Sequence, residues 1–264
     1  MSDSLFEVKS LCRDFKLPRS AISGARPVRH AVADLNLKIE IGDRLGVVGE
    51  SGSGKTTLAK LLLNLDKPTS GSINFKGQKL SNSEMSNFRR EAQIIFQDPR
   101  SSLDPRRTIA EIIREPLECL NFQQDHQSRI NKVLQQVELD ASIRSRYPHE
   151  LSGGQRQRVA IARALAAQPS VLIADEPVSA LDVLVREEIL QLMSALIESL
   201  NLTLVLISHD LSVITRLCKT VVVMQQGRIV EAGNTQDVFA NPQHQFTKDL
   251  ISAVPRLPIA KKIS

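Results

Sequence analysis

The chain has 264 residues, of which 42% are hydrophobic, so it can form one large domain or two small ones with a sizeable core. Its formal net charge of +5 is spread along the chain, and its three cysteines lack C-x-x-C spacing, which argues against a zinc or redox site and suits a reducing compartment. The first ten residues contain no long apolar core and no stretch approaches 18 uncharged apolar residues, so neither a signal peptide nor a membrane span is expected.

Hydrophobic alternation predicts strands near the N-terminus. Residues Leu5–Ser10 alternate loosely and are expected to form a strand, and Phe15 follows it. A broken, basic segment over residues 16–30 is expected to be a long loop with solvated charges. Apolar and polar residues then alternate strictly, which predicts a half-buried strand at Asp34–Ile41 and a turn at Gly42-Asp43.

The sequence from Gly49 to Thr56 fits the pattern G-x-x-x-x-G-K-[ST] of a phosphate-binding P-loop. The apolar run Leu45–Val48 precedes it as a predicted strand and Thr57–Leu63 follows it as a predicted helix, which is the context the motif requires. Its glycines let backbone N–H groups turn toward phosphate oxygens, and the helix N-terminus adds roughly half a positive charge. Lys55 and Thr56 suit phosphate and Mg²⁺ respectively. A plain Gly/Ser surface loop is the alternative, which the flanking strand and helix disfavour.

The pattern changes after residue 97. Before it we predict a turn at Pro68–Gly71, a short strand at Ser72–Phe75, a helix at Glu84–Arg90 and a strand at Ala92–Phe96 that ends on Gln97. From position 98 to about 167 strand patterns are absent, and apolar residues recur at helical spacing. This segment is therefore expected to be an inserted helical lobe.

A second informative stretch is Leu151-Ser-Gly-Gly-Gln155, which begins a helix predicted for Arg156–Ala167. Ser152 suits the N-cap position, and the two glycines allow a phosphate to approach closely, although a plain helix cap would look the same. The motif lies 24 residues before Asp175 (151 to 175), where the apolar run Val171–Ala174 ends in Asp-Glu-Pro. That run is typical of a buried parallel strand.

The remaining elements alternate between helices and strands. An amphipathic helix is predicted at residues 184–200, with its inner side formed by Val185, Ile189, Leu192, Met193, Leu196, Ile197 and Leu200. A strand follows at Thr203–Ile207 and ends at Ser208-His209. Further predictions are a helix at 211–217, a hairpin of strands 220–224 and 228–231, helices at 235–240 and 245–253, and a mobile tail at 255–264.

These motifs together resemble the nucleotide-binding subunits of ATP-binding cassette (ABC) transporters over nearly the whole chain. Gly49–Thr56 resembles the Walker A loop, Leu151–Gln155 the family signature and Val171–Asp175 the Walker B strand. The resemblance also makes Gln97 the Q-loop glutamine, Glu176 the catalytic glutamate and His209 the switch histidine. The ATP-binding residues that it implies are Phe15, which would stack on adenine, and Gly49, Glu50, Ser51, Gly52, Ser53, Gly54, Lys55, Thr56, Thr57, Ser152, Gly153, Gly154, Gln155 and Asp182.

The implied roles agree with the chemistry of the residues. Asp175 is a hard oxygen ligand that can hold Mg²⁺ together with Thr56, while Gln97 would sense the metal and water. Glu176 would act as the general base on the attacking water, worth about 10²–10⁴ in rate. His209 would contact the γ-phosphate. The plainer alternatives are a helix-entry carboxylate for Glu176, a satisfied histidine for His209 and a polar strand end for Gln97.

Pairing of subunits is a further implication of the resemblance. In the family two subunits meet head to tail, so Ser152, Gly153 and Gly154 would complete the ATP site of the partner. Asp182, in the stretch Ser179–Asp182 that resembles the D-loop, would bond across the same boundary, although as a mere N-cap it would look the same. Hydrolysis would open this interface and move the transmembrane subunits.

Two segments narrow the branch of the family. Phe96–Arg106 and His244–Pro255 resemble the dipeptide/oligopeptide/nickel importer group, and the chain is similar to its second, shorter ATPase subunit. The resemblance implies a second ATPase subunit as partner (a heterodimer, with a homodimer as the alternative), two transmembrane permease subunits and an extracytoplasmic substrate-binding protein. Peptide is the expected cargo, with nickel or a metal chelate second. We expect a peripheral position on the cytoplasmic face of the inner membrane.

The expected fold is α/β: a P-loop NTPase core with a mostly parallel sheet, an N-terminal antiparallel β subdomain and an inserted α-helical signature subdomain. We expect a single ABC ATPase domain over 1–264, with parts at 1–97, 98–167, 168–240 and 241–264. The cofactors should be ATP and Mg²⁺, without an iron–sulfur cluster because no cysteine follows Cys218. A soluble ABC-type ATPase acting on nucleic acid or ribosomes is an alternative of a different class, which the single P-loop and the lack of a long heptad run or cysteine pairs disfavour.

Overall fold

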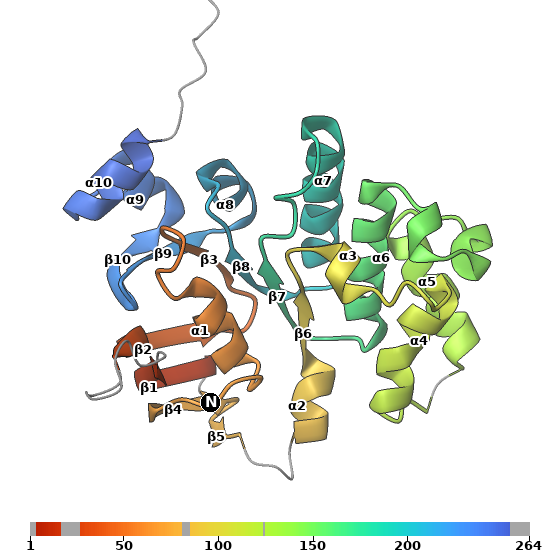
Figure 1. Ribbon diagram of the computed structural model, residues 1–264, viewed down its shortest axis with the longest axis horizontal. Helices are drawn as coiled ribbons and strands as arrows, with labels where there is room; N and C mark the ends of the chain where they lie inside the picture. Colours follow the sequence, from red (N-terminus) through yellow and green to blue (C-terminus); the bar gives the residue numbers. More distant parts are fainter. Residues whose placement is uncertain (1–3, 17–26, 81–84, 124, 254–264) are drawn as a thin grey trace, which may run out of the picture.

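The computed structural model describes residues 4–16, 27–80, 85–123 and 125–253, which form two β-sheets and surrounding helices (Figure 1). In the larger sheet five neighbouring strands are parallel to one another, and the edge strand Arg228–Asn234 is antiparallel to its neighbour Thr220–Gln225. This confirms the mostly parallel core expected from the sequence. Its six strands lie in the order β10 (Arg228–Asn234), β9 (Thr220–Gln225), β3 (Arg44–Val48), β8 (Thr203–Ile207), β7 (Val171–Asp175) and β6 (Ala92–Ile95).

The smaller sheet is antiparallel, as expected for the N-terminal part. Its strands lie in the order β2 (Val28–Glu40), β1 (Ser4–Lys16), β4 (Ser70–Phe75) and β5 (Gln78–Lys79). Helix α1 (Lys55–Leu62) lies between the two sheets in Figure 1. Leu58 and Leu61 of this helix pack in one hydrophobic cluster with Phe6 of β1 and Val47 of β3, which fixes the P-loop helix against both sheets.

Side chains of the central strands point alternately to the two faces of the sheet. Val47 and Ile173 join the cluster around α1, whereas their neighbours Val48 and Ala174 join a second cluster on the opposite face. Both faces are covered, which explains the continuous apolar runs of β7 and β8. The helices that contribute to the second cluster include α6 (Gly153–Ala166), α7 (Val183–Ser199), α8 (Leu211–Leu217), α9 (Thr235–Ala240) and α10 (Gln245–Ser252).

The segment from residue 98 to 167 is helical, as predicted, and lies beside β6 and α7 in Figure 1. Thr108 forms a capping box with Glu111 at the start of the helix Ile109–Cys119. Asp125 caps the next helix, His126–Gln136, by accepting from two backbone N–H groups. Its apolar residues share one cluster with the central sheet. Its helices are α3 (Pro99–Ser102), α4 (Ile109–Cys119), α5 (His126–Gln136), the 3₁₀ turns η1 (Ala141–Ser145) and η2 (Pro148–Glu150), and α6; helix α2 (Met85–Glu91) precedes β6.

Several boundaries differ from the sequence prediction. Strand β1 continues to Lys16 and β2 begins at Val28, so both ends of the predicted basic loop are strand residues. Residues 17–26 of that loop lie outside the described residues, and Pro27 belongs to no strand. The first residue of the predicted helix at 84–90 and the predicted mobile tail at 255–264 also lie outside the described residues. Leu200, predicted to face inward, is the C-cap of α7 and is 37% exposed. None of the helices in the described ranges is long and apolar enough to cross a membrane.

Candidate active site

The P-loop connects the carboxyl end of β3 to the N-terminus of α1. Gly49 and Gly54 adopt φ angles of 149° and 108°, which other residues rarely adopt. A Cβ atom at Gly49 would lie 2.2 Å from the carbonyl oxygen of Met224, and one at Gly54 would lie 2.1 Å from that of Ala31. Both close approaches require glycine, because neighbouring backbone presses on the loop from β9 and β2.

Lys55 is the first residue of α1, and its side chain turns back over the loop. Its Nζ donates to the carbonyl oxygens of Gly49 and Glu50 at 2.8 Å each. Burial lowers the pKa of Lys55, and the carboxylates of Glu176, Asp175 and Glu50 act in the opposite direction. An ammonium group has three donors, and within the part of the chain that the structure describes two of them are used, so the third can bind a phosphate oxygen.

Glu176 lies at the centre of a polar triad at the carboxyl edge of the central sheet. Its Oε2 accepts from Nε2 of Gln97 at 2.9 Å, and its Oε1 lies 2.9 Å from Nδ1 of His209. The three residues follow β7, β6 and β8, which are neighbours in the sheet. Glu176 has a φ of 48°, and its N–H donates to Ile207 O at 2.9 Å. The sheet topology thus brings together residues that are 79 and 33 positions apart in sequence.

A cavity of about 580 Å³ opens between the P-loop and this triad. Its size lies within the range of typical small-molecule sites, and its place outside the carboxyl ends of parallel strands is where open α/β sheets bind ligands. The residues that line it come from the antiparallel sheet, the P-loop and the triad. They are Phe15, Arg29, Ala31, Ser51, Gly52, Gly54, Lys55, Thr56, Thr57, Gln97, Glu176 and His209.

A second cavity, of about 450 Å³, shares Thr56 and Gln97 with the first and also includes Asp175. The three residues predicted to hold a metal therefore line one space. Burial raises the pKa of Asp175, with the charge of Glu176 adding to the rise, while the Thr56 side chain and the charges of Lys55 and Lys60 act to lower it. These oxygen donors suit Mg²⁺, which in phosphate-binding sites uses one or two carboxylates together with substrate phosphates.

Phe15, near the end of β1, lines the main cavity from the antiparallel sheet, whereas the triad lines it from the central sheet. Its side chain is partly exposed, and the guanidinium of Arg13 lies over the ring at 4.6 Å from the centroid. Arg13 is held in turn by Asp66, with N–O distances of 2.9 Å and 2.8 Å. One face of the ring is thus covered by a cation that is itself held in place.

The signature residues lie at the N-terminus of α6, away from the P-loop cavity of their own chain. Ser152 Oγ accepts from Gln155 N at 3.2 Å, and Gln155 Oε1 accepts from Ser152 N at 3.0 Å, a complete capping box. A Cβ atom at Gly154 would lie 2.6 Å from Cγ1 of Val185, so glycine permits close packing against α7. Asp182 caps α7 by accepting from Val185 N at 3.1 Å.

The predicted site residues thus separate into groups. Those from Ser51 to Thr57, apart from Ser53, line the main cavity with Phe15 and the triad. Ser53 and Glu50 line a small neighbouring cavity of about 110 Å³ that also includes Phe246. Asp175 lines the metal cavity. Of the described residues that line the main cavity, none belongs to the signature or is Asp182.

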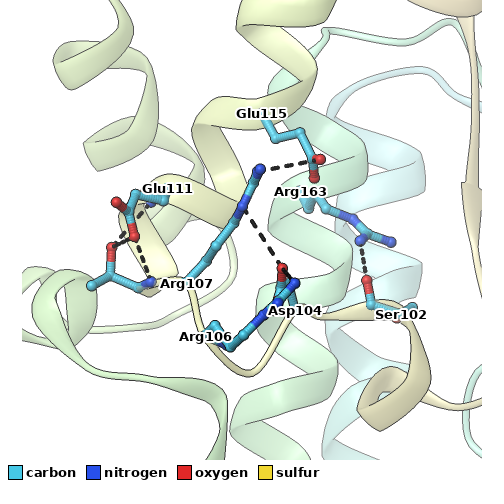
Figure 2. A network of polar contacts seen from close by, with 8 residues as sticks. Ser102, Asp104, Arg106, Arg107, Glu111, Glu115 and Arg163 are labelled. Atoms are coloured by element: carbon cyan, nitrogen blue, oxygen red, sulfur yellow. Dashed lines mark hydrogen bonds and ion pairs between the residues drawn. The ribbon is translucent and has the colours of Figure 1, made fainter.

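Polar contacts join residues 102–107, the segment shortly after Gln97, to helices α4 and α6. Figure 2 shows Arg107 between two carboxylates, with its nitrogens 3.9 Å from Asp104 and 3.3 Å from Glu115. Arg163 of α6 donates to the carbonyl oxygen of Ser102 in α3. The helix that begins with the signature is therefore tied to the segment that leaves the Q-loop position.

Sequence reasoning missed two features near the site. The sequence predicts a loop at Arg29, but Arg29 lies in β2, lines the main cavity and donates to Gly52 O at 3.1 Å. Arg186 of α7 donates to Asp210, the residue after His209 and the N-cap of α8. Residues 28–32 do not alternate between buried and exposed, so the start of β2 has no signal in the sequence, and neither has the contact between α7 and α8.

The fold and the site together define a P-loop nucleoside triphosphate hydrolase. A family model described as ABC transporter matches residues 32–179, a range that includes the P-loop, the signature and Asp175. The chain therefore belongs to the ABC transporter family, and it is an ATPase of the transport type. This confirms the resemblance stated from the motifs.

Among curated relatives, a probable peptide ABC transporter ATP-binding protein of Sinorhizobium fredii is 45% identical over 261 residues, covering 97% of this chain and 74% of the relative. The dipeptide transport ATP-binding protein DppF of Haemophilus influenzae is 48% identical over 233 residues, covering 86% and 71%. The oligopeptide transport ATP-binding protein OppF of Bacillus subtilis is 40% identical over 262 residues, covering 97% and 84%.

Solved structures of cassettes share the fold. CbiO1 of Clostridium perfringens, part of the ABC transporter complex CbiONQ, has a TM-score of 0.76 and 28% identity, covering 91% of this chain and 92% of its own. The ATP-binding cassette MJ0796, solved as a dimer in a post-hydrolysis state with ADP and Pi, has a TM-score of 0.75 and 30% identity, covering 88% and 99%. The α/β cassette fold expected from the sequence is thus confirmed.

Proposed function

We propose that this chain is the ATP-hydrolysing subunit of a peptide importer and works at the cytoplasmic face of the inner membrane. The observation that carries the proposal is the triad of Gln97, Glu176 and His209 facing a P-loop cavity. The peptide and dipeptide transport names of close relatives support the cargo. Peptide is favoured over nickel or a metal chelate on that ground, and an ATPase acting on nucleic acid or ribosomes has no support among these relatives.

ATP is expected to lie along the main cavity, with adenine on Phe15 and the terminal phosphate at the triad. Lys55 would neutralise β- and γ-phosphate charge with its third donor. The N–H groups of the loop and of the first turn of α1 would bind the phosphates between these ends. The supporting residues here are Gly49, Glu50, Ser51, Gly52, Ser53, Gly54, Thr56 and Thr57.

Thr56, Gln97 and Asp175 would hold Mg²⁺. The cation would neutralise phosphate charge and so ease attack at the γ-phosphorus. The buried Asp175 carboxyl, whose pKa is raised by burial, is well placed to gain a positive partner. Thr56 and Asp175 line the same cavity, so their oxygen atoms are available to one cation.

Glu176 would accept the proton of the attacking water. Its carboxylate already has a fixed direction, because Gln97 and His209 each bond to one oxygen. His209 has an exposed ring and would contact the γ-phosphate and orient the water. The gain from a positioned general base is about 10²–10⁴ in rate.

A second cassette would complete the site. Because the signature lies outside its own chain's cavity, Ser152, Gly153, Gly154 and Gln155 would bind the nucleotide held by the partner, and Asp182 would bond across the same boundary. The dimeric state of the related cassette MJ0796 supports such pairing. We infer a heterodimer with a second ATPase subunit, carried by two permease subunits and supplied by an extracytoplasmic binding protein.

We further infer one ATPase domain over 1–264, with the helical part at 98–167 inserted between 1–97 and 168–240 and followed by an extension at 241–264. The shared hydrophobic cluster of the helical lobe and the central sheet supports a single domain. The absence of a membrane-crossing helix among the described residues agrees with peripheral attachment through the permeases.

The test uses Glu176→Gln, which should bind ATP without hydrolysing it. Its mass in solution is measured by light scattering with and without MgATP. A rise from about 29 kDa to twice that mass with ATP alone supports a nucleotide-dependent homodimer. A monomer that binds ATP points to a different ATPase partner, which co-purification from membranes would recover. Vesicles that carry the complex assembled with the wild-type subunit and its binding protein should then hydrolyse ATP faster with peptide than with nickel. A faster rate with nickel would overturn the peptide assignment.

A further inference from the structure

We propose that Arg29 is a nucleotide-binding residue that holds the phosphate next to the ribose of ATP. The proposal rests on the function proposed above, because it requires ATP in the P-loop cavity. It adds a residue outside the P-loop and the signature to the site, and it assigns that residue to the α-phosphate, which ATP and ADP share.

The sheet register places Arg29 beside Phe15. The two residues are direct partners in the antiparallel pairing of β1 with β2, so their side chains lie on the same face of the sheet. Both line the main cavity. An adenine stacked on Phe15 would therefore bring its ribose and first phosphate past the Arg29 guanidinium.

The guanidinium is held at the cavity with donors to spare. Among the described residues it makes one hydrogen bond, to Gly52 O at 3.1 Å. A guanidinium has five N–H donors in a planar fork that matches a phosphate. The bond to Gly52 fixes Arg29 against the P-loop and leaves the other donors available for a ligand.

The two cationic residues of the cavity, Arg29 and Lys55, have different charged neighbours, which suggests that they bind different phosphates. Of the described residues that line it, Arg29 and Lys55 are the two with a permanent or near-permanent positive charge. Lys55 lies near the carboxylates of Glu176, Asp175 and Glu50, at the end where the terminal phosphate reacts. Arg29 instead pairs with Phe15 across the antiparallel sheet, and Glu176 is the one carboxylate among the described residues that line the cavity. Arg29 therefore suits a phosphate distant from the reacting one.

The experiment measures binding of MgATP and MgADP by calorimetry at low and high salt for the wild type, Arg29→Met and Arg29→Lys. We expect Arg29→Met to bind both nucleotides roughly tenfold more weakly, by the same factor, because a charge-assisted hydrogen bond to a shared phosphate is lost. Arg29→Lys should recover part of the affinity. The loss should shrink at high salt, because screening weakens a direct ionic contact.

Lys38→Met is the matched control. It removes one positive charge from the other end of the same strand, where it does not line the cavity, and should leave both affinities unchanged. Thermal unfolding without nucleotide checks that each variant is folded.

Three results would overturn the assignment. Unchanged affinities in Arg29→Met would show that the residue does not contact the nucleotide. A loss for ATP alone would place it at the γ-phosphate. A loss that is independent of salt and accompanied by a lower Tm would show that Arg29 only braces the loop at Gly52. If the wild type bound neither nucleotide, the proposed function itself would fail, and this inference with it.

Discussion

Glu176 and His209 are joined through one carboxylate oxygen, with 2.9 Å between Oε1 and Nδ1. They follow the neighbouring strands β7 and β8, and the backbone N–H of Glu176 is also bonded to Ile207 at the end of β8. The carboxylate is thus tied to the next strand by both side chain and main chain. A base held in this way loses little freedom when a water molecule is bound, which favours proton transfer.

The first prediction concerns Glu176→Gln. The amide keeps the shape of the side chain but cannot accept a proton from water, so we expect kcat to fall by about 10²–10⁴. ATP affinity should change by less than about threefold, because no P-loop contact is lost. Single-turnover hydrolysis and equilibrium binding measure the two quantities. Normal turnover in this variant would assign the base to another residue.

Lys55→Ala should remove nucleotide binding or weaken it by about 100-fold or more. The variant loses a charge-assisted bond to the phosphates, and it also leaves the carbonyl oxygens of Gly49 and Glu50 without their present donor. Calorimetry with MgATP measures the loss. Lys132→Ala, at an exposed position in α5 that lines neither cavity, is the control for loss of a helical lysine. An unchanged affinity in Lys55→Ala would contradict the P-loop assignment.

Gly54→Ala tests the close approach of β2 to the P-loop. The added Cβ would lie 2.1 Å from Ala31 O, so the loop must shift, and we expect ATP binding to be lost and stability to fall by about 2 kcal/mol or more. Gly42→Ala is the matched control: its φ of +83° gives similar strain, but nothing lies within 4 Å of its added Cβ. Urea unfolding and ATP binding are measured for both variants, and the larger loss in Gly54→Ala should report the steric clash, because backbone strain is present in both. Equal effects in both variants would contradict the clash.

Ser152→Arg should spare ATP binding by the isolated subunit and abolish ATP hydrolysis by the assembled transporter. The serine lies outside the cavity of its own chain, where a bulky cation would not interfere, but it would block the surface facing the partner's phosphates. Ser128→Arg, at an exposed position near the start of α5, is the control and should hydrolyse ATP normally. Weaker ATP binding by the isolated Ser152→Arg subunit would contradict this placement.

Asp210 should contribute stability that depends on pH. Burial acts to raise its pKa, but hydrogen bonds from Ser212 and Arg186 outweigh burial and hold the pKa below its usual value of 3.8. The lowered pKa means that the ionised form is favoured by folding, so the stabilisation is full above pH 3.8 and is lost as pH falls through the folded-state pKa.

At pH 7 we expect Asp210→Ala to lower the free energy of unfolding by about 1–2 kcal/mol, through loss of the α8 cap and of the contact with Arg186. The difference from wild type should shrink in urea titrations near pH 3. Asp210→Asn keeps a capping oxygen without the charge and should fall between the two proteins. A difference that does not vary with pH would contradict the role of the charge.

Much of the fold follows from local patterns. The alternation of β2, the apolar runs of β3, β7 and β8, and the helical spacing after position 97 were all visible, because these patterns report burial on one or both faces of an element. The strand ends near Lys16 and Val28 were missed, since basic residues and prolines hid the continuation of a hairpin that pairs Phe15 with Arg29. The exposure of Leu200 was also missed, because a helix end departs from the face that periodicity assigns.

The site was predictable where a motif has a mechanism, and less so where it depends on topology. The P-loop and the acidic pair after β7 carry their chemistry in adjacent residues. The bonds of Glu176 to Gln97 and His209 depend on strand order, which the sequence does not display. Arg29 and the link between Arg186 and Asp210 depend on how separate elements pack, so no spacing in the chain indicated them.

The separation of the signature from the P-loop cavity has a consequence for inheritance. If two different subunits share the sites, a lesion at Ser152 in this gene disables the nucleotide site of the other gene's product, and the altered protein still binds ATP normally. If the chain pairs with itself, cells that make both a Lys55→Ala copy and a Ser152→Arg copy assemble mixed dimers. One of the two sites in each mixed dimer has both halves intact, so two defective alleles would partly restore each other.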